Sequence, residues 1–360
     1  MSGFSLLFFF LFFRAVPGFS DTERLTAEVE LVFRDTYPLE GSVSLSAALF
    51  HWVDSLAGTS GGKTIPVYRE EFRRRFGDFS EADRSFLQKF EATRLQDAAL
   101  GRRGSGSRGS PKMLGVFLQE PDLEAAFARI EPVLGPEAVD AMASALEHFR
   151  PRYEEIWDGG SMARGFLDGA RSDPERKKLE GFLARVAGFF GVDPLSVPRP
   201  RLVVVPVPPD DGTHAQAVGK NLLVEVRPGE SLIDEVAPIV HENAHYLWQR
   251  MSQDLQNRLL EVVRNHAAGA QAWALLGEAL PTAIAQGVAE RTFQPSRWSP
   301  ELEWYHIPAV DSYAKRIYPA VQEALDTGAL FDEMMMRKLL WAFQGKRGRD
   351  GRPKITPPSP

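Results

Sequence analysis

The spacing of apolar and polar positions divides the chain into helical regions and one short strand region. From about Asp21 to Leu100, apolar residues recur at spacings of three and four, as in the segment Glu23 to Phe33, and this spacing predicts amphipathic helices. The pattern resumes from about Pro121 to Gly191, where Pro151 and glycines interrupt it. We therefore expect a largely helical first half.

The pattern changes at Arg201, where β-branched residues bounded by prolines predict a strand over Leu202 to Val207. The segments Gly212 to Gly219 and Leu222 to Val226 predict one or two further strands. From Asp254 almost to Gly345 the spacing is helical again. The predicted fold class is α+β and predominantly helical, with a small mixed β-sheet.

One helix lies between the last predicted strand and Asp254. Ser231 can cap this helix, Asp234 adds a favourable negative charge near its start, and several apolar residues after Ser231 give it a buried face. Pro238 leaves two interpretations, because it either kinks the helix or marks a later start near Asp234 to Ala237.

The first 20 residues have the character of a signal peptide. The apolar run Phe4 to Phe13 is too short to span a bilayer, and Gly18 and Ser20 occupy the −3 and −1 positions for cleavage before Asp21. The alternatives are a short membrane anchor or a misassigned start codon. We expect a secreted or periplasmic protein, of bacterial export, without stable membrane insertion after cleavage.

The same features give the expected domain boundaries. The expected parts are a signal peptide (1–20), a helical N-terminal region (21–100), a flexible Gly/Ser/Arg loop (101–112), a helical accessory region (113–198), a catalytic domain (199–344) and a disordered tail (345–360).

Composition narrows the chemistry. A formal charge of −6 and a pI near 5.8 argue against a nucleic-acid-binding surface. The chain has no cysteine, so disulfides, thiolate metal sites and cysteine nucleophiles are excluded. Any metal must be held by the seven histidines and by carboxylates.

The residues His241-Glu242-Asn243-Ala244-His245 form an H-E-x-x-H motif. On a helix, residues four apart share one face, so His241 and His245 can bind one zinc ion while Glu242 acts as general base toward a water that the metal activates. The alternative is a pair of core histidines. The longer three-histidine form of the motif is excluded, because Trp248 and Met251 occupy its Gly and His positions.

Glu278 is the candidate third ligand. It is the one acidic residue in the apolar stretch Leu275 to Ile284, where an acid needs a partner. Pro281 suggests that the helix begins near Gly277, which puts Glu278 in its first turn. The alternative is a carboxylate that only caps this helix. With a water, His241, His245 and Glu278 would complete an open tetrahedral zinc site.

These residues resemble the gluzincin branch of the zincin metallopeptidases, over about Arg201 to Tyr318. The resemblance implies a zincin-like catalytic domain that cleaves a peptide or protein substrate. It also implies that the strand ahead of the motif helix, Leu222 to Val226, pairs with the extended substrate. The position four after the third ligand, often acidic in the family, is Thr282 in this chain.

The resemblance also implies a His or Tyr from a later segment that stabilises the oxyanion. The candidates are His306 and Tyr313, followed by Tyr305; His214 and His266 could also reach the site.

Two other functions stay open at this point. One is a zincin-fold binding or scaffold protein without catalytic activity. The other is a helical structural protein in which the H-E-x-x-H motif is accidental, and there His241, His245 and Glu278 would lie far apart.

Overall fold

A computed structural model gives the fold and the side chains of four stretches of the chain. The described residues are 28–60, 64–102, 112–209 and 214–344. The predicted signal peptide, the predicted tail and most of the predicted Gly/Ser/Arg loop lie outside these stretches.

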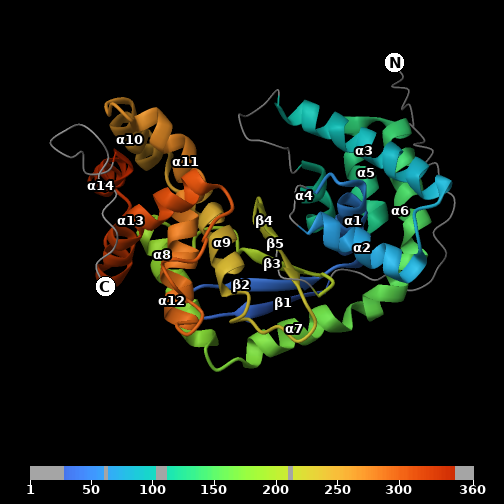
Figure 1. The fold of residues 1–360 in the computed structure, drawn as a ribbon, viewed down its shortest axis with the longest axis horizontal. Helices are drawn as coiled ribbons and strands as arrows, with labels where there is room; N and C mark the ends of the chain where they lie inside the picture. The colour runs from blue at the N-terminus through green and yellow to red at the C-terminus, as the bar shows by residue number, and fades with distance from the viewer. Residues whose placement is uncertain (1–27, 61–63, 103–111, 210–213, 345–360) are drawn as a thin grey trace, which may run out of the picture.

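A small mixed sheet lies at the centre of the molecule (Figure 1). Its five strands follow the order β1-β2-β3-β5-β4. The pairs β2·β3 and β3·β5 are parallel, whereas β1·β2 and β4·β5 are antiparallel. The strands are β1 (Glu28–Phe33), β2 (Leu39–Val43), β3 (Arg201–Pro206), β4 (Ala215–Val218) and β5 (Asn221–Val226). The predominantly helical α+β class with a small mixed sheet is confirmed.

The expected helix over Glu23 to Phe33 is wrong in its described part, which is strand β1. In the sequence EVELVF, charged and apolar residues alternate at first, which is the period of a half-buried strand. β1 pairs with β2, and β2 pairs in parallel with β3 from the second half of the chain. The sheet therefore joins the N-terminal region to the expected catalytic domain.

Strands β3 and β5 form the buried centre of the sheet. Residues Leu202 to Val205 are at most 1% exposed, because helices cover both faces. A strand covered on both faces is apolar at every position, whereas a strand with one solvated face alternates between apolar and polar residues. This accounts for the continuous β-branched run of β3.

A first group of helices packs on one side of the sheet (Figure 1). Its core is rich in phenylalanine, with Phe50 stacked on Phe117 at a centroid separation of 4.2 Å. The group consists of α1 (Leu45–Ala57), α2 (Ile65–Phe76), α3 (Glu81–Arg102), α4 (Lys112–Gln119), α5 (Leu123–Leu134) and α6 (Pro136–Trp157).

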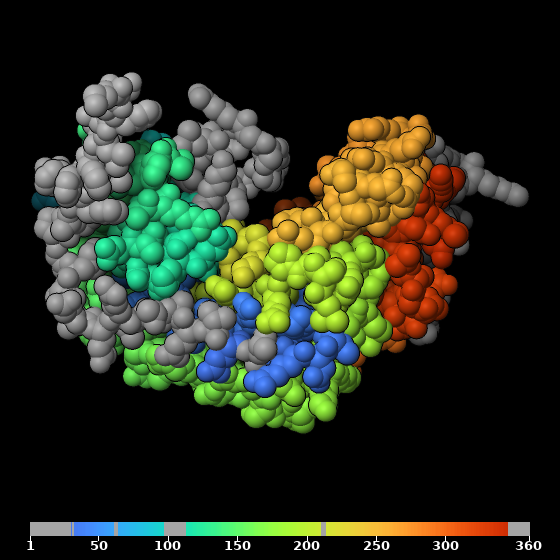
Figure 2. Space-filling model, turned by 180° about the vertical axis from the view of Figure 1, so that it is seen from behind, coloured from blue at the N-terminus to red at the C-terminus, as the bar shows by residue number. Residues whose placement is uncertain are grey.

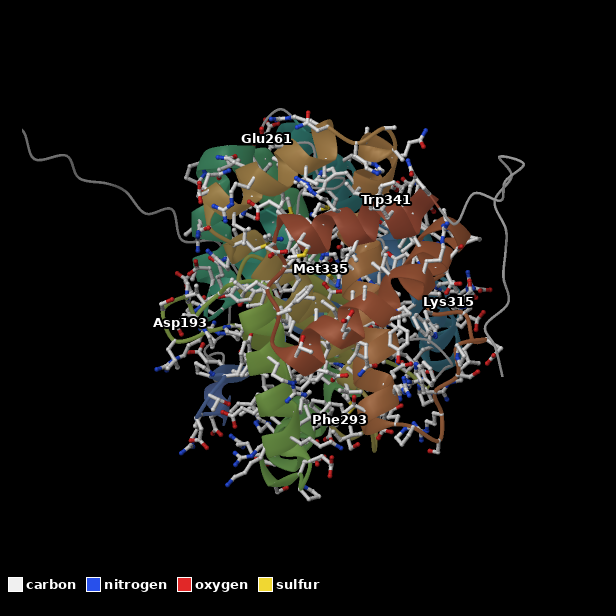
Figure 3. All side chains as sticks on the ribbon, turned by 90° about the vertical axis from the view of Figure 1, so that its left-hand side faces the viewer. Asp193, Glu261, Phe293, Lys315, Met335 and Trp341 are labelled. Carbon is white, nitrogen blue, oxygen red and sulfur yellow. The ribbon has the colours of Figure 1, made fainter. Side chains whose placement is uncertain are left out.

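A short 3-10 turn, η1 (Asp158–Gly160), leads into α7 (Ser161–Ser172), which crosses beside the sheet to the second group. Figure 3 views this second group from outside, with Glu261 of α10 and Phe293 of α12 near opposite ends. The group consists of α8 (Arg176–Phe189), α9 (Val236–Arg250), α10 (Gln253–Arg264), α11 (Gly269–Thr282), the π-helical segment η2 (Ala283–Ala289), α12 (Glu290–Phe293), α13 (Pro308–Thr327) and α14 (Glu333–Gln344).

The two groups of helices leave a hollow between them. In Figure 2 it lies between the teal residues of the first group and the orange residues of the second, with yellow-green segments at its floor. Helix α9 contacts β4 and β5 at this position, from the side opposite α1. No helix within the described residues is long and apolar enough to cross a membrane.

Candidate metal centre

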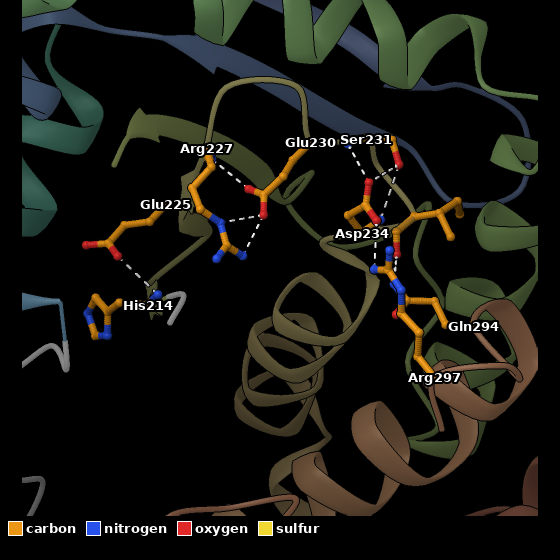
Figure 4. A network of polar contacts seen from close by, with 9 residues as sticks. His214, Glu225, Arg227, Glu230, Ser231, Asp234, Gln294 and Arg297 are labelled. Atoms are coloured by element: carbon orange, nitrogen blue, oxygen red, sulfur yellow. Dashed lines mark hydrogen bonds and ion pairs between the residues drawn. The ribbon is translucent and has the colours of Figure 1, made fainter. Parts of the chain in front are cut away.

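The motif helix α9 begins at Val236, so the later of the two predicted starts is confirmed. Before it, the chain turns through two local networks: Arg227 pairs with Glu230, and Ser231 donates to Asp234 (Figure 4). Pro238 is the third residue of α9, where a missing N–H costs no helical hydrogen bond. The helix is therefore regular through His241 and His245.

The two motif histidines face the same point. The Nε2 atoms of His241 and His245 are 3.1 Å apart, and their rings meet at a centroid separation of 4.8 Å. One helical turn separates them, as the motif predicts. They are not a pair of isolated core histidines, because they converge on a third polar side chain that is partly exposed.

Glu278 of α11 is that third side chain. Its Oε2 atom lies 3.4 Å from Nε2 of His241 and 3.4 Å from Nε2 of His245. The expected helix start near Gly277 is wrong: α11 begins at Gly269, so Glu278 lies well inside the helix and caps nothing. Pro281 is accommodated within the helix, which continues as the π-helical segment η2. Such segments relieve lost i→i−4 bonds and are frequent at functional sites.

Nε2 of His241, Nε2 of His245 and Oε2 of Glu278 form a nearly equilateral triangle, named here the His-His-Glu triangle. Within the described residues, this is the group of histidine and acidic side chains that could hold a metal ion. Two ligands at 2.0–2.1 Å from a tetrahedral zinc ion would be about 3.3 Å apart, which matches the sides of this triangle. Two imidazoles and one carboxylate are also zinc's usual donor set in a catalytic site. The residues therefore fit a zinc ion.

The triangle is partly accessible to solvent. The Glu278 side chain is 42% exposed, that of His245 23% and that of His241 10%. Burial would raise the pKa of Glu278, but hydrogen bonds and charge from the two imidazoles hold it well below its ordinary value. Burial would lower the pKa of His245, but Glu278 and Glu242 raise it. A carboxylate that stays ionised suits a metal ligand.

The carboxylate of Glu242 touches the edge strand of the sheet. Its Oε2 accepts a hydrogen bond from the backbone N–H of Ala217 at 2.6 Å. The expectation that Leu222 to Val226 is the free edge is wrong, because this segment, β5, is paired on both sides. The edge strand on this side of the sheet is β4, a short strand that directly precedes β5 in the sequence.

The backbone groups of β4 alternate in direction. Ala217 lies opposite Leu222, and Gln216 lies opposite Leu223. Opposite residues in an antiparallel pair alternate between those that exchange backbone hydrogen bonds and those that do not. Because the Ala217 N–H points to Glu242, the backbone groups of Ala215 and Ala217 face the free edge, beside the motif helix.

Of the three candidate donors, Tyr305 reaches the triangle. Its hydroxyl donates to Oε2 of Glu278 at 3.0 Å, and its ring stacks on His241 at 6.1 Å. Burial first, and then the charge of Glu278, raise the pKa of Tyr305, so its hydroxyl stays protonated.

The other two candidates are placed differently. His306 is exposed and stacks on Tyr305 at 4.6 Å. Tyr313 is fully buried, and its hydroxyl donates to the carbonyl of Leu339 at 3.1 Å. Tyr313 is therefore a core residue between α13 and α14, and the ranking that put it ahead of Tyr305 is corrected.

The loop that carries Tyr305 is fixed by α13. Oδ1 of Asp311 accepts hydrogen bonds from the backbone N–H groups of Trp304 at 2.7 Å and Tyr305 at 3.2 Å, and Lys315 pairs with the same carboxylate at 2.9 Å. Trp304 packs in turn against Tyr318. The tyrosine is thus held by its backbone as well as by its hydroxyl.

Two buried polar residues next to the ligand positions differ in whether their side chains find a partner. Asn243 is buried and accepts a hydrogen bond from Tyr37, which anchors α9 to the first strands. Thr282, four residues after Glu278, is buried, and within the described structure its hydroxyl has no hydrogen-bond partner. It therefore does not orient a ligand through a hydrogen bond.

One polar cluster was missed from the sequence. Glu225 of β5 is fully buried and bonds to His51 of α1 and to Thr64. A signal for it exists, because an acid inside the apolar run Leu222 to Val226 needs a partner, as Glu278 does. The other two candidate histidines, His214 and His266, do not touch the triangle: His214 stacks on His51, and His266 packs against Trp341.

The chain was compared with protein-family models, with curated protein sequences and with solved structures, and none of them matches. The function must therefore be argued from the site itself.

Proposed function

We propose that this protein is a zinc-dependent hydrolase that cleaves peptide bonds in the manner of a gluzincin metallopeptidase. One observation carries the proposal: the His-His-Glu triangle has the dimensions of a zinc site, and the Glu242 carboxylate beside it is bonded to the edge strand at Ala217. The distances contradict the alternative in which the three residues lie far apart.

His241, His245 and Glu278 would hold the ion. When bound, zinc supplies a Lewis acid that polarises a carbonyl group and makes a water molecule more acidic. The carboxylate of Glu242 accepts the proton of the attacking water and passes it to the leaving amine. The hydrogen bond from Ala217 fixes the position of this carboxylate relative to the edge strand.

The edge strand can bind an extended peptide. Backbone N–H and C=O groups of Ala215 and the C=O of Ala217 face the free edge, where an added strand would pair with them. The peptide's scissile carbonyl would then lie next to Glu242.

Tyr305 is the proposed oxyanion donor. Its protonated hydroxyl lies at the edge of the triangle, bonded to Glu278. To stabilise a tetrahedral intermediate, this hydroxyl would turn from Glu278 to the oxyanion, while Asp311 holds the backbone of Tyr305 in place. A polar donor and a solvent-accessible triangle together favour the enzyme over a binding protein that merely carries a metal.

The test separates metal binding from catalysis. We expect wild-type protein to hold one zinc ion per chain and to cleave members of a diverse peptide library. Glu242→Gln should keep the zinc, because Glu242 is not in the triangle, and should lose about 100-fold to 10,000-fold in kcat, the usual contribution of a general base. Glu261→Gln, an exposed change on α10, is the matched control and should behave as wild type.

Three outcomes would contradict the proposal in different ways. Wild-type protein without stoichiometric zinc removes the metal centre. Undiminished cleavage by Glu242→Gln removes its role as base. Zinc binding by wild type without cleavage of any peptide leaves the binding protein as the function.

A further inference from the structure

Glu225 brings three separate segments together at the beginning of the edge strand β4. Its Oε1 accepts hydrogen bonds from Nε2 of His51 and from the hydroxyl of Thr64, both at 2.8 Å. Its Oε2 accepts from the backbone N–H of His214 at 3.1 Å (Figure 4). His51, Thr64, His214 and Glu225 are named here the Glu225 cluster.

The cluster is a closed polar site inside the protein. Glu225 has no exposed surface and His51 is 2% exposed. The rings of His51 and His214 are parallel at 6.1 Å, and Tyr68 of α2 packs on His51 at 5.9 Å. If this buried carboxylate lost its three hydrogen bonds, the free energy of the folded protein would rise strongly. The carboxylate therefore holds the three donor segments firmly in place.

The donors belong to different parts of the molecule. His51 lies on α1, and Thr64 directly precedes α2, so both belong to the first group of helices. His214 directly precedes β4, whereas Glu225 belongs to the neighbouring strand β5. The cluster therefore ties the first group of helices to the beginning of the edge strand.

A short path leads from the cluster to the general base. Strand β4 has four residues, and its beginning is held by the bond from His214 to Glu225. Three residues further on, the N–H of Ala217 donates to Glu242. A shift of the strand at His214 would be transmitted through this stretch to both the free edge and the Glu242 carboxylate.

We infer that Glu225 and His51 are positioning residues, through which the N-terminal helices set the place of the edge strand for an extended peptide substrate. This inference rests on the proposed function, since it assigns the substrate to β4. It gives the N-terminal helical region a role in substrate binding that the triangle alone would not reveal.

The same group of helices contains a control pair of similar chemistry. Nε2 of His148 on α6 lies 2.7 Å from Oδ1 of the buried Asp83 on α3, close to the 2.8 Å of the His51 pair. His148 contacts Asp83, Phe86 and Phe149, which all lie on helices α3 and α6 and not on the sheet. His148→Leu should therefore loosen the helices without moving β4.

The first experiment needs no activity. Backbone amide exchange of residues 215–218 would be measured in zinc-loaded wild type, His51→Leu and His148→Leu. We expect the exchange rate in β4 to rise by about tenfold or more in His51→Leu and to stay at the wild-type rate in His148→Leu. Only the first change removes a contact that holds β4, so only this change makes local opening of the strand more frequent. Equal exchange in the two variants would overturn the inference.

Milder variants keep the test valid if His51→Leu fails to fold. In His51→Gln the amide nitrogen can still donate to Glu225, so exchange in β4 should return close to wild type. Thr64→Val removes one of the three donors without changing side-chain size and should give a smaller rise. Wild-type exchange in both His51→Leu and Thr64→Val would likewise overturn the inference.

The second experiment uses cleavage. With peptides long enough to pair along β4, His51→Leu should raise KM by about tenfold with zinc content unchanged, because misplacing a binding element weakens substrate alignment. His148→Leu should leave KM unchanged. A rise of KM in both variants would show a merely structural role. If wild type cleaves nothing, the proposed function fails, and the exchange experiment alone decides the role of the cluster.

Discussion

Glu225 and Glu278 are the same residue type in the same kind of sequence context, yet Glu225 has a structural role and Glu278 is a candidate metal ligand. Each is an acid within an apolar run, and each faces imidazole nitrogen atoms in the fold. The Glu278 side chain is 42% exposed, whereas Glu225 has no exposed surface. The comparison shows that burial and spacing decide whether a His and Glu group can hold a metal or holds the protein together.

The distances make the difference physical. His51 lies 2.8 Å from Glu225, which is a direct hydrogen bond that leaves no room for an ion. The two imidazoles lie 3.4 Å from Glu278, which is the separation of ligands around a zinc ion. Glu225 also accepts bonds from Thr64 and a backbone N–H, so its oxygens are already satisfied. Glu278 is partly exposed and lies farther from its imidazole partners, so its carboxylate can still bind an ion.

The largest difference should appear in stability when each acid is removed from zinc-free protein. Glu225→Ala should lower the free energy of unfolding by about 3–5 kcal/mol, because His51, Thr64 and the His214 N–H lose their buried partner. Glu278→Ala should change it by less than about 1 kcal/mol, because exposed ion pairs contribute little. Urea unfolding in the presence of a chelator measures both. Similar losses in the two variants would break the comparison.

The reverse order is expected for zinc affinity. Glu278→Ala should weaken zinc binding by more than about 100-fold, because even changes to outer residues that support a ligand cost about 10- to 100-fold. Glu225→Gln keeps an acceptor oxygen in the cluster and should leave zinc affinity within a few fold of wild type. Competition against a chromophoric chelator provides the measurement. Tight zinc binding by Glu278→Ala would remove Glu278 from the ligand set.

The sequence was sufficient for the triangle because its signals are local or chemically exceptional. The i, i+4 spacing of His241 and His245 fixes their common face wherever the helix lies. Glu278 was found because a lone acid in an apolar stretch needs a partner. The same argument applied to Glu225 would have indicated the cluster. Its partners could not have been named, since His51 and Thr64 come from distant segments that only the tertiary fold brings together.

The failures have equally specific causes. Strand β1 was taken for a helix because its short apolar run fits both periods, and its pairing with β2 decides the matter. Pro281 suggested a helix start, but the packed α11 absorbs it and continues as η2. Tyr305 could not be separated from Tyr313 by composition. Asp311 holds the backbone of Tyr305, whereas Tyr313 faces α14, and neither contact is visible in sequence.

A further acid, Glu235, sharpens the comparison because it is buried like Glu225 but is not surrounded by donors. Glu235, directly before α9, is 1% exposed, and its Oε2 has no hydrogen-bond partner within the described structure. Burial first, and then the neighbouring Glu230, raise the pKa of Glu235 to about 8. The lesson of Glu225 is that a buried carboxylate is stabilising only when donors surround it, so this acid should be destabilising once ionised.

The smallest of the three expected effects therefore depends on pH. Since the pKa of Glu235 is higher in the folded than in the unfolded protein, the folded state binds more protons between about pH 4.5 and pH 8, and stability falls as the pH rises through this window. Glu235→Gln removes that loss. We expect the variant to match wild type near pH 4.5 and to exceed it by about 1–3 kcal/mol at pH 8.5, the usual cost of an unsatisfied buried polar group. Urea unfolding at the two pH values measures this, with Glu261→Gln as the exposed control. A difference that does not grow with pH would mean that Glu235 has a donor after all.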